Sequence, residues 1–206
     1  MIGYYNYTVI LTYLGLASGM CGIFAAIQSH PVAALICLMF AGLFDMFDGF
    51  VARTKDRTKN EKKFGIELDS LSDIVCFGVL PAIIGFSLGL KAWYFNIILI
   101  LYVLAALIRL AYFNVMEDAR QEQTTETRKS YEGLPVTSVA LILPFLYPIL
   151  SLAGSFLYIA YGIVLLIIGF LFLSKIKVTK FKLKGMLALI AVGAVELLIL
   201  ILTKIL

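Results

Sequence analysis

The chain contains a series of apolar stretches, each close to the length of a helix that crosses a lipid bilayer. Such a helix needs about 20 predominantly apolar residues. Turn signals such as His30-Pro31, Gly89 and Gly154 separate the stretches. The stretches lie near residues 8–28, 32–53, 65–88, 93–116, 134–152, 155–174 and 185–205. The sequence therefore predicts an all-α fold, a polytopic membrane bundle of helices.

Composition excludes an ordinary soluble domain. Of the 206 residues, 62% are hydrophobic and 15% are charged, whereas soluble domains are about 45–50% apolar and about 25% charged. A soluble protein of this size could not bury so much apolar surface in one core. We therefore predict a single integral-membrane domain over residues 1–206. Its core of six spans would occupy 8–174, with one further C-terminal span at 185–205.

Basic residues gather in alternate connections between the predicted spans. Fourteen of the seventeen lysines and arginines lie in 53–63, 117–130 and 175–184, and the intervening connections hold only Lys91. This asymmetry predicts a multi-pass protein of the cell membrane with its N-terminus and basic connections in the cytoplasm. The same charges would attract anionic membrane lipids. Because they form no stripe interleaved with aromatic residues, we expect no nucleic-acid partner.

Four aspartates are unusual because charged residues inside membrane spans are costly and usually functional. Asp45 and Asp48 are three residues apart near the end of the second span, and Asp69 and Asp73 are four apart near the start of the third. These spacings place two carboxylates on one face of each helix. A short connection makes the two spans antiparallel neighbours. The four carboxylates are therefore expected to meet near the cytoplasmic boundary.

The four carboxylates would repel one another strongly in a low dielectric unless protons or cations intervene. Oxygen ligands select hard cations, so we predict two divalent ions, Mg²⁺ or Mn²⁺, with Ca²⁺ as an alternative. Two such ions can clamp a diphosphate. Gly49 and Gly65 would let a ligand approach the backbone, Ala52 keeps the helix face flat, and Arg53 offers a planar guanidinium to a phosphate. A single aspartate could be a helix cap or an ion-pair partner of a lysine, but four on two facing helices indicate a site.

The pattern Asp45-x2-Asp48-Gly49-x2-Ala52-Arg53…Gly65-x3-Asp69-x3-Asp73 resembles the signature of the CDP-alcohol phosphotransferase family. The resemblance implies a bundle with six core membrane helices, usually a homodimer, that uses a CDP-activated lipid and releases CMP. It implies that the four aspartates are metal ligands and that Asp73 is also the general base. The CDP site would be lined by Asp48, Gly49, Ala52, Arg53, Gly65 and Asp69. Eleven residues separate Arg53 from Gly65, more than is usual in the family, and they are expected to lengthen the cytoplasmic loop.

Other segments are similar to the phosphatidylserine synthases of this family. They are Glu67–Asp73, Phe77-Gly78-Val79 with Pro81-Ala82, Arg109–Asn114 and Glu132–Pro135. This similarity implies transfer of a phosphatidyl group, or of an ether-linked archaetidyl group, to L-serine. Arg109 lies deep in a predicted span, and we interpret it, with Asn114, as a binder of the serine carboxylate or of a lipid phosphate. A snorkelling or structurally paired arginine is the alternative interpretation.

Other functions remain open on the sequence alone. The same chemistry could use inositol, inositol phosphate or glycerol 3-phosphate as the acceptor. A phosphorylated acceptor would need a further basic pocket, and Arg109 alone offers little toward one. A cation transporter is a more distant alternative, because transporters usually place their ion site at the bilayer midplane on broken helices, commonly with inverted repeats. No internal repeat is visible here.

Overall fold

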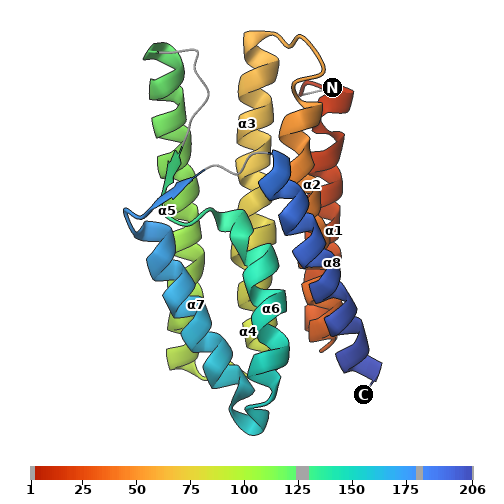
Figure 1. Cartoon of the computed structure of the whole chain (residues 1–206). Helices are drawn as coiled ribbons and strands as arrows, with labels where there is room; N and C mark the ends of the chain where they lie inside the picture. Colours follow the sequence, from red (N-terminus) through yellow and green to blue (C-terminus); the bar gives the residue numbers. More distant parts are fainter. Residues whose placement is uncertain (1–2, 124–129, 180–182, 206) are drawn as a thin grey trace.

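The computed structural model describes residues 3–123, 130–179 and 183–205. It is a bundle of helices that run roughly along one axis, with the two chain ends at opposite ends of the bundle (Figure 1). The α-helices are α1 Ile10–Ile27, α2 Pro31–Val51, α3 Lys59–Asp73, α4 Leu80–Leu88, α5 Trp93–Gln123, α6 Val139–Ser151, α7 Leu157–Leu173 and α8 Leu183–Ile205. A π-helical turn, Ile74–Val79, joins α3 to α4. Short 3-10 turns lie at Tyr7–Val9, Val136–Ser138 and Gly154–Phe156.

The polytopic helical bundle expected from the sequence is confirmed. In the described part of the chain, five helical segments are long and apolar enough to cross a membrane: Tyr7–Ile27, Pro31–Val51, Lys59–Leu88, Trp93–Arg120 and Gly154–Leu173. Two shorter apolar helices lie at Val136–Ser151 and Leu187–Leu202. Large apolar side chains such as Ile100 on α5 and Phe170 on α7 face outward. An apolar outer surface of this kind suits a bilayer as the solvent.

The start of the third span differs from the prediction. We expected a helix from residue 65 and a lengthened loop before it, but α3 begins at Lys59. A capping box fixes this start: the backbone N–H of Thr58 donates to the Glu61 carboxylate at 2.8 Å, and the Glu61 N–H donates to the Thr58 hydroxyl at 3.3 Å. These bonds satisfy donors that the first turn would otherwise leave free. The extra residues therefore lengthen the helix more than the loop.

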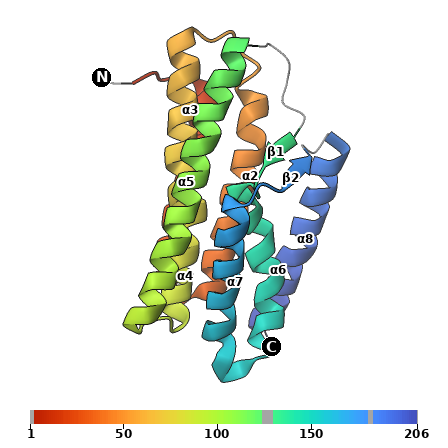
Figure 2. The ribbon, with the colours of Figure 1, turned by 90° about the vertical axis from the view of Figure 1, so that its left-hand side faces the viewer.

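Two short strands are the other departure from the expected fold. β1 (Ser130–Glu132) pairs antiparallel with β2 (Lys177–Thr179), and the central pair of the register is Tyr131 with Val178 (Figure 2). The backbone N–H of Gly133 continues the link by donating to the Ile176 carbonyl at 2.8 Å. The ribbon joins the segment before α6 to the segment after α7. The pairing holds the chain before α6 beside the chain after α7.

The π-helical turn is stabilised by side chains from neighbouring helices. Pro81 has no N–H to donate to the preceding turn, and the buried hydroxyl of Tyr102 on α5 donates to the Phe77 carbonyl in that turn at 2.7 Å. The Tyr161 hydroxyl on α7 donates to the Pro81 carbonyl at 3.1 Å. The irregular part of the third span is thus held by α5 and α7. A π turn in this place rotates the start of the span relative to its end.

Tyr102→Phe is expected to lower the stability of the protein by about 1–3 kcal/mol, because it removes the hydroxyl donor and leaves a buried carbonyl without this partner. The loss would be measured as a lower unfolding temperature of the purified protein in detergent. Tyr94→Phe on the exposed side of α5 is the matched control. An unchanged unfolding temperature for Tyr102→Phe would contradict this role of the hydroxyl.

Candidate active site

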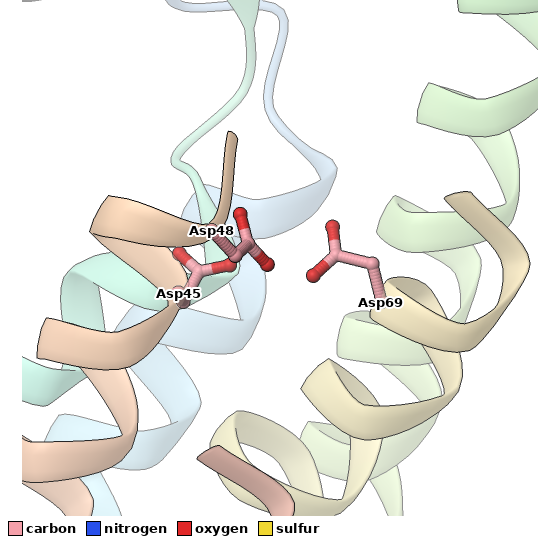
Figure 3. A group of neighbouring side chains, drawn as sticks. All are labelled: Asp45, Asp48 and Asp69. Carbon is pink, nitrogen blue, oxygen red and sulfur yellow. The ribbon is translucent and has the colours of Figure 1, made fainter. Parts of the chain in front are cut away.

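Three of the predicted aspartates form one cluster. Asp45 and Asp48 come from α2 and Asp69 comes from α3, and one carboxylate oxygen from each lies within 4.8 Å of the others. Figure 3 shows the side chains of α2 pointing across to that of α3. All three are half-buried. The helical spacing and the antiparallel arrangement therefore bring these carboxylates together as the sequence predicted.

Asp73 lies one helical turn further along α3, deeper in the bundle. Its side chain is buried, and it lines the same small cavity as the other three aspartates. It does not belong to the cluster of oxygens within 4.8 Å. The cavity measures about 10 Å³, and Thr12 and Gly15 of α1 close its other side. That helix packs against both α2 and α3, so α1 fixes the separation of the two acidic helices.

The residues assigned to the nucleotide lie beside the cluster at the same end of the bundle. Gly49 is exposed near the end of α2, and a Cβ added to it would meet no atom within 4 Å. Ala52 follows the last residue of α2, and the Arg53 side chain is exposed. Gly65 lies on α3, one turn before Asp69. Protein packing does not require a glycine at position 49, so the open space there is available to a ligand.

A large apolar groove begins at the acidic cluster. It has a volume of about 770 Å³ and lies between α2, α6 and α8. Its walls include Met39, Leu43, Met46, Leu141, Phe145 and Leu189. Asp45 lines both this groove and the acidic cavity. The arrangement therefore offers an anionic end, lined by carboxylates, joined to an apolar space of the size that holds small amphiphilic ligands.

The two residues assigned to the acceptor, Arg109 and Asn114, do not line the acidic cavity. Asn114 on α5 donates from Nδ2 to the Ser70 hydroxyl on α3 at 2.9 Å. Arg109 is buried on α5, with its guanidinium 5.5 Å from the centre of the Phe113 ring. A Cβ on Gly133 would lie 3.2 Å from Nε of Arg109. Asn114 thus connects α5 to α3, Arg109 lies beside Gly133, and the role of both residues toward an acceptor stays a prediction.

The sequence interpretation missed the groove and the residues that form it. Spans 134–152 and 185–205 are apolar around most of their circumference, so their sequences do not show which face looks inward. The only acidic residue in the sequences of these two spans is Glu196, which is 5% exposed and lines the groove. A buried acidic residue within an apolar span indicates an inward face. Glu196 alone could therefore have predicted which face of span 185–205 forms a wall of the groove.

Comparison with known proteins shows a family over nearly the whole chain. The sequence model of the CDP-alcohol phosphatidyltransferase family matches residues 5–204. An archaetidylserine synthase of Methanothermobacter thermautotrophicus is 33% identical over 169 residues, which are 82% of this chain and 67% of that protein. The family match over residues 5–204 includes both acidic helices and nearly all of the helices that form the groove.

Two further relatives carry another name. A CDP-diacylglycerol–serine O-phosphatidyltransferase of Methanocaldococcus jannaschii is 33% identical over 151 residues, 73% of this chain and 66% of the relative. The enzyme of that name from Saccharomyces cerevisiae is 43% identical over 106 residues, 50% of this chain and 37% of the relative. The chain thus spans about two thirds of the archaeal relatives and little more than a third of the yeast protein.

Proposed function

Because the chain belongs to the CDP-alcohol phosphatidyltransferase family, we propose that it transfers a phosphatidyl or archaetidyl group from a CDP-lipid to the hydroxyl of L-serine and releases CMP. The names of the relatives support serine as the acceptor. The observation that carries the proposal is the position of Asp45, which lines both the acidic cavity and the apolar groove. A CDP-lipid has the matching shape, with an anionic diphosphate at one end and apolar chains at the other.

The donor set fits a divalent cation. The clustered oxygens of Asp45, Asp48 and Asp69 are hard ligands of the kind that Mg²⁺ and Mn²⁺ prefer. We propose that these residues, with Asp73 beside them, hold two such ions. Bound ions would neutralise charge on the diphosphate.

The remaining chemistry is assigned to the chain's own residues. Asp73 accepts the proton of the serine hydroxyl, whose oxygen attacks the phosphorus on the lipid side of the diphosphate. A new oxygen–phosphorus bond forms, the bond from that phosphorus to the bridging oxygen breaks, and the electron pair leaves with CMP. Gly49, Ala52, Arg53 and Gly65 line the space for the nucleotide beside the cluster. The groove keeps the lipid chains out of water during the transfer.

The direct test of the acceptor is CMP release by the purified protein from a CDP-lipid with Mg²⁺ or Mn²⁺. Serine, inositol, inositol phosphate and glycerol 3-phosphate would be compared at equal concentration. The proposal predicts release that requires both the metal and serine. Release with another acceptor only would keep the family and discard serine, and no release with any acceptor from folded protein would contradict the proposed reaction.

Gly49→Ala is expected to separate binding from folding. Because the added Cβ meets no protein atom within 4 Å, and alanine favours a helix over glycine by about 1 kcal/mol, the unfolding temperature should stay the same or rise. The methyl group would occupy space assigned to the nucleotide, so the KM for the CDP-lipid should increase. Gly42→Ala is the opposite control, since its Cβ would clash with Cβ of Ala140 on α6 and lower stability. An unchanged KM in Gly49→Ala would place the nucleotide elsewhere.

We also propose that the site lies near the cytoplasmic face of the cell membrane. The family resemblance supports the further proposal that the protein is a homodimer. Asp45 and Asp48 are in the last turns of α2, and that end of α2 lies at the end of the bundle that carries the N-terminus and the basic α2–α3 connection (Figure 1). The α4–α5 and α6–α7 connections lie at the other end. Four basic residues used in the charge argument, Arg128, Lys129, Lys180 and Lys182, fall outside the described residues. Water-soluble serine and CMP would enter and leave from the cytoplasm.

A further inference from the structure

Arg57 lies over the nucleotide side of the site, although it is outside the family signature. It belongs to the connection between α2 and α3. A Cβ built on Gly65 would lie 3.2 Å from Nη1 of Arg57, so the guanidinium rests against the one α3 glycine that the signature contains. It is also close enough to Asp48 to interact with it electrostatically. Arg57 is half-buried, whereas its neighbours from Arg53 to Asp56 and from Thr58 to Asn60 are exposed.

The connection that carries Arg57 is anchored on both sides of it. Before it, the Thr54 hydroxyl donates to the Val51 carbonyl at 2.8 Å and is hydrogen-bonded to the Tyr7 hydroxyl at 2.9 Å. After it, Thr58 is fixed by the capping box of α3. Nζ of Lys55 lies 3.6 Å from Oε1 of Glu61, and this ion pair links the residues before Arg57 to the first turn of α3. The backbone that carries Arg57 is therefore anchored, and the side chain reaches Gly65 from a fixed position on the connection.

The N-terminal segment supports this anchoring. Asn6 donates from Nδ2 to the Glu61 carboxylate at 3.2 Å, and the rings of Tyr4 and Phe64 pack edge to face with centroids 5.6 Å apart. In the described part of the chain, the Arg57 guanidinium makes no hydrogen bond and no ion pair. A placed, half-buried guanidinium without such a bond is suited to receive an anion.

We propose that Arg57 binds the diphosphate of the CDP-lipid, on the side of the nucleotide facing Gly65, and stabilises the charge that develops on the departing CMP. This assignment rests on the proposed function. During transfer, the electron pair of the broken oxygen–phosphorus bond stays on the phosphate of CMP, and a guanidinium can hold two of its oxygens at once. The segment between Arg53 and Gly65 thus supplies a second arginine to the nucleotide site.

The test compares Arg57→Gln and Arg57→Lys with Lys63→Gln, which removes the same charge from an exposed position two residues before Gly65, on another face of α3. Binding of CDP with Mg²⁺ to the purified protein is measured by calorimetry, and KM values are measured for the CDP-lipid and for serine. Arg57→Gln should weaken CDP binding and lower kcat/KM for the CDP-lipid by about 10- to 100-fold. Arg57→Lys should recover part of the loss, because it keeps the charge but not the planar fork. The KM for serine should change less than about twofold, well short of the effect on the CDP-lipid.

The outcomes separate this proposal from the proposed function. Equal behaviour of Arg57→Gln and Lys63→Gln in folded protein would overturn the role of Arg57 and leave the reaction intact. A rise in the KM for serine alone, with CDP binding unchanged, would assign the guanidinium to the acceptor carboxylate and overturn the diphosphate assignment. Failure of the wild-type protein to bind CDP would contradict the proposed function itself, and the assignment of Arg57 with it.

Discussion

Asp73→Asn is expected to reduce CMP release by about 10²- to 10⁴-fold, the range that a positioned general base contributes. Asn has nearly the same shape as Asp, so the packing around this buried position on α3 should survive. The amide oxygen of Asn is too weak a base to take the proton of the acceptor hydroxyl. Turnover would be measured with the wild-type and variant proteins under identical metal and substrate concentrations.

Folding and substrate binding provide the checks on this result. The unfolding temperature of Asp73→Asn should equal that of the wild type or exceed it, because the change removes one negative charge from an acidic cavity. Binding of CDP should change less than turnover, because the clustered carboxylates of Asp45, Asp48 and Asp69 remain available to the metal. Asp118→Asn at an exposed position on α5 is the matched control. Full turnover in Asp73→Asn would exclude Asp73 as the base, and loss of the fold would show that its role is structural.

Asp69→Asn is expected to abolish the response of the protein to divalent cations. Its carboxylate is one of three whose oxygens lie within 4.8 Å of one another, so removing its charge should weaken metal binding. Loss of an outer-shell partner typically costs about 10- to 100-fold in metal affinity or activity, and loss of a direct ligand should cost at least as much. CMP release should fall accordingly.

The unfolding temperature tests the same prediction without any turnover. In a chelator, Asp69→Asn should be more stable than the wild type, because two clustered carboxylates repel less than three. Added Mg²⁺ or Mn²⁺ should raise the unfolding temperature of the wild type, since a ligand that binds only the folded state stabilises it. The variant should show little of this increase. Glu67→Gln, exposed two residues earlier on α3, should behave as the wild type does. A metal response that persists in Asp69→Asn would contradict the metal assignment.

The acidic cluster could be predicted because its geometry depends on local rules. The spacings of Asp45 from Asp48 and of Asp69 from Asp73 set the helix faces, and a short connection made the helices antiparallel neighbours. The start of α3 could also have been predicted, since Thr58 and Glu61 are three residues apart, as a capping box requires. The apolar pattern by itself predicts a later start, near residue 65, because residues 59–63 are all polar.

The parts that depend on contacts between distant segments were beyond the sequence. Glu196 marks an inward face of α8, but the sequence does not indicate that this face packs against α2 and α6 to form the groove. The position of the Arg57 backbone depends on the hydrogen bond between Tyr7 and Thr54 before it and on the capping box after it.

The close packing of α1, in contrast, could be predicted from Gly15-x3-Gly19, a spacing of small residues that lets helices approach. A Cβ on Gly19 would lie 2.5 Å from Sγ of Cys76 in the π turn.

The central claim is that a hydroxyl of serine attacks the lipid-side phosphorus at the aspartate cluster. It is tested most directly with L-serine that carries ¹⁸O in its side-chain hydroxyl, incubated with the purified protein, a CDP-lipid and Mg²⁺ or Mn²⁺. Mass spectrometry would locate the label. The account predicts that the serine phospholipid retains the ¹⁸O and that the released CMP contains none, with no product from Asp73→Asn. Label in CMP, or no labelled lipid from folded wild-type protein, would contradict it.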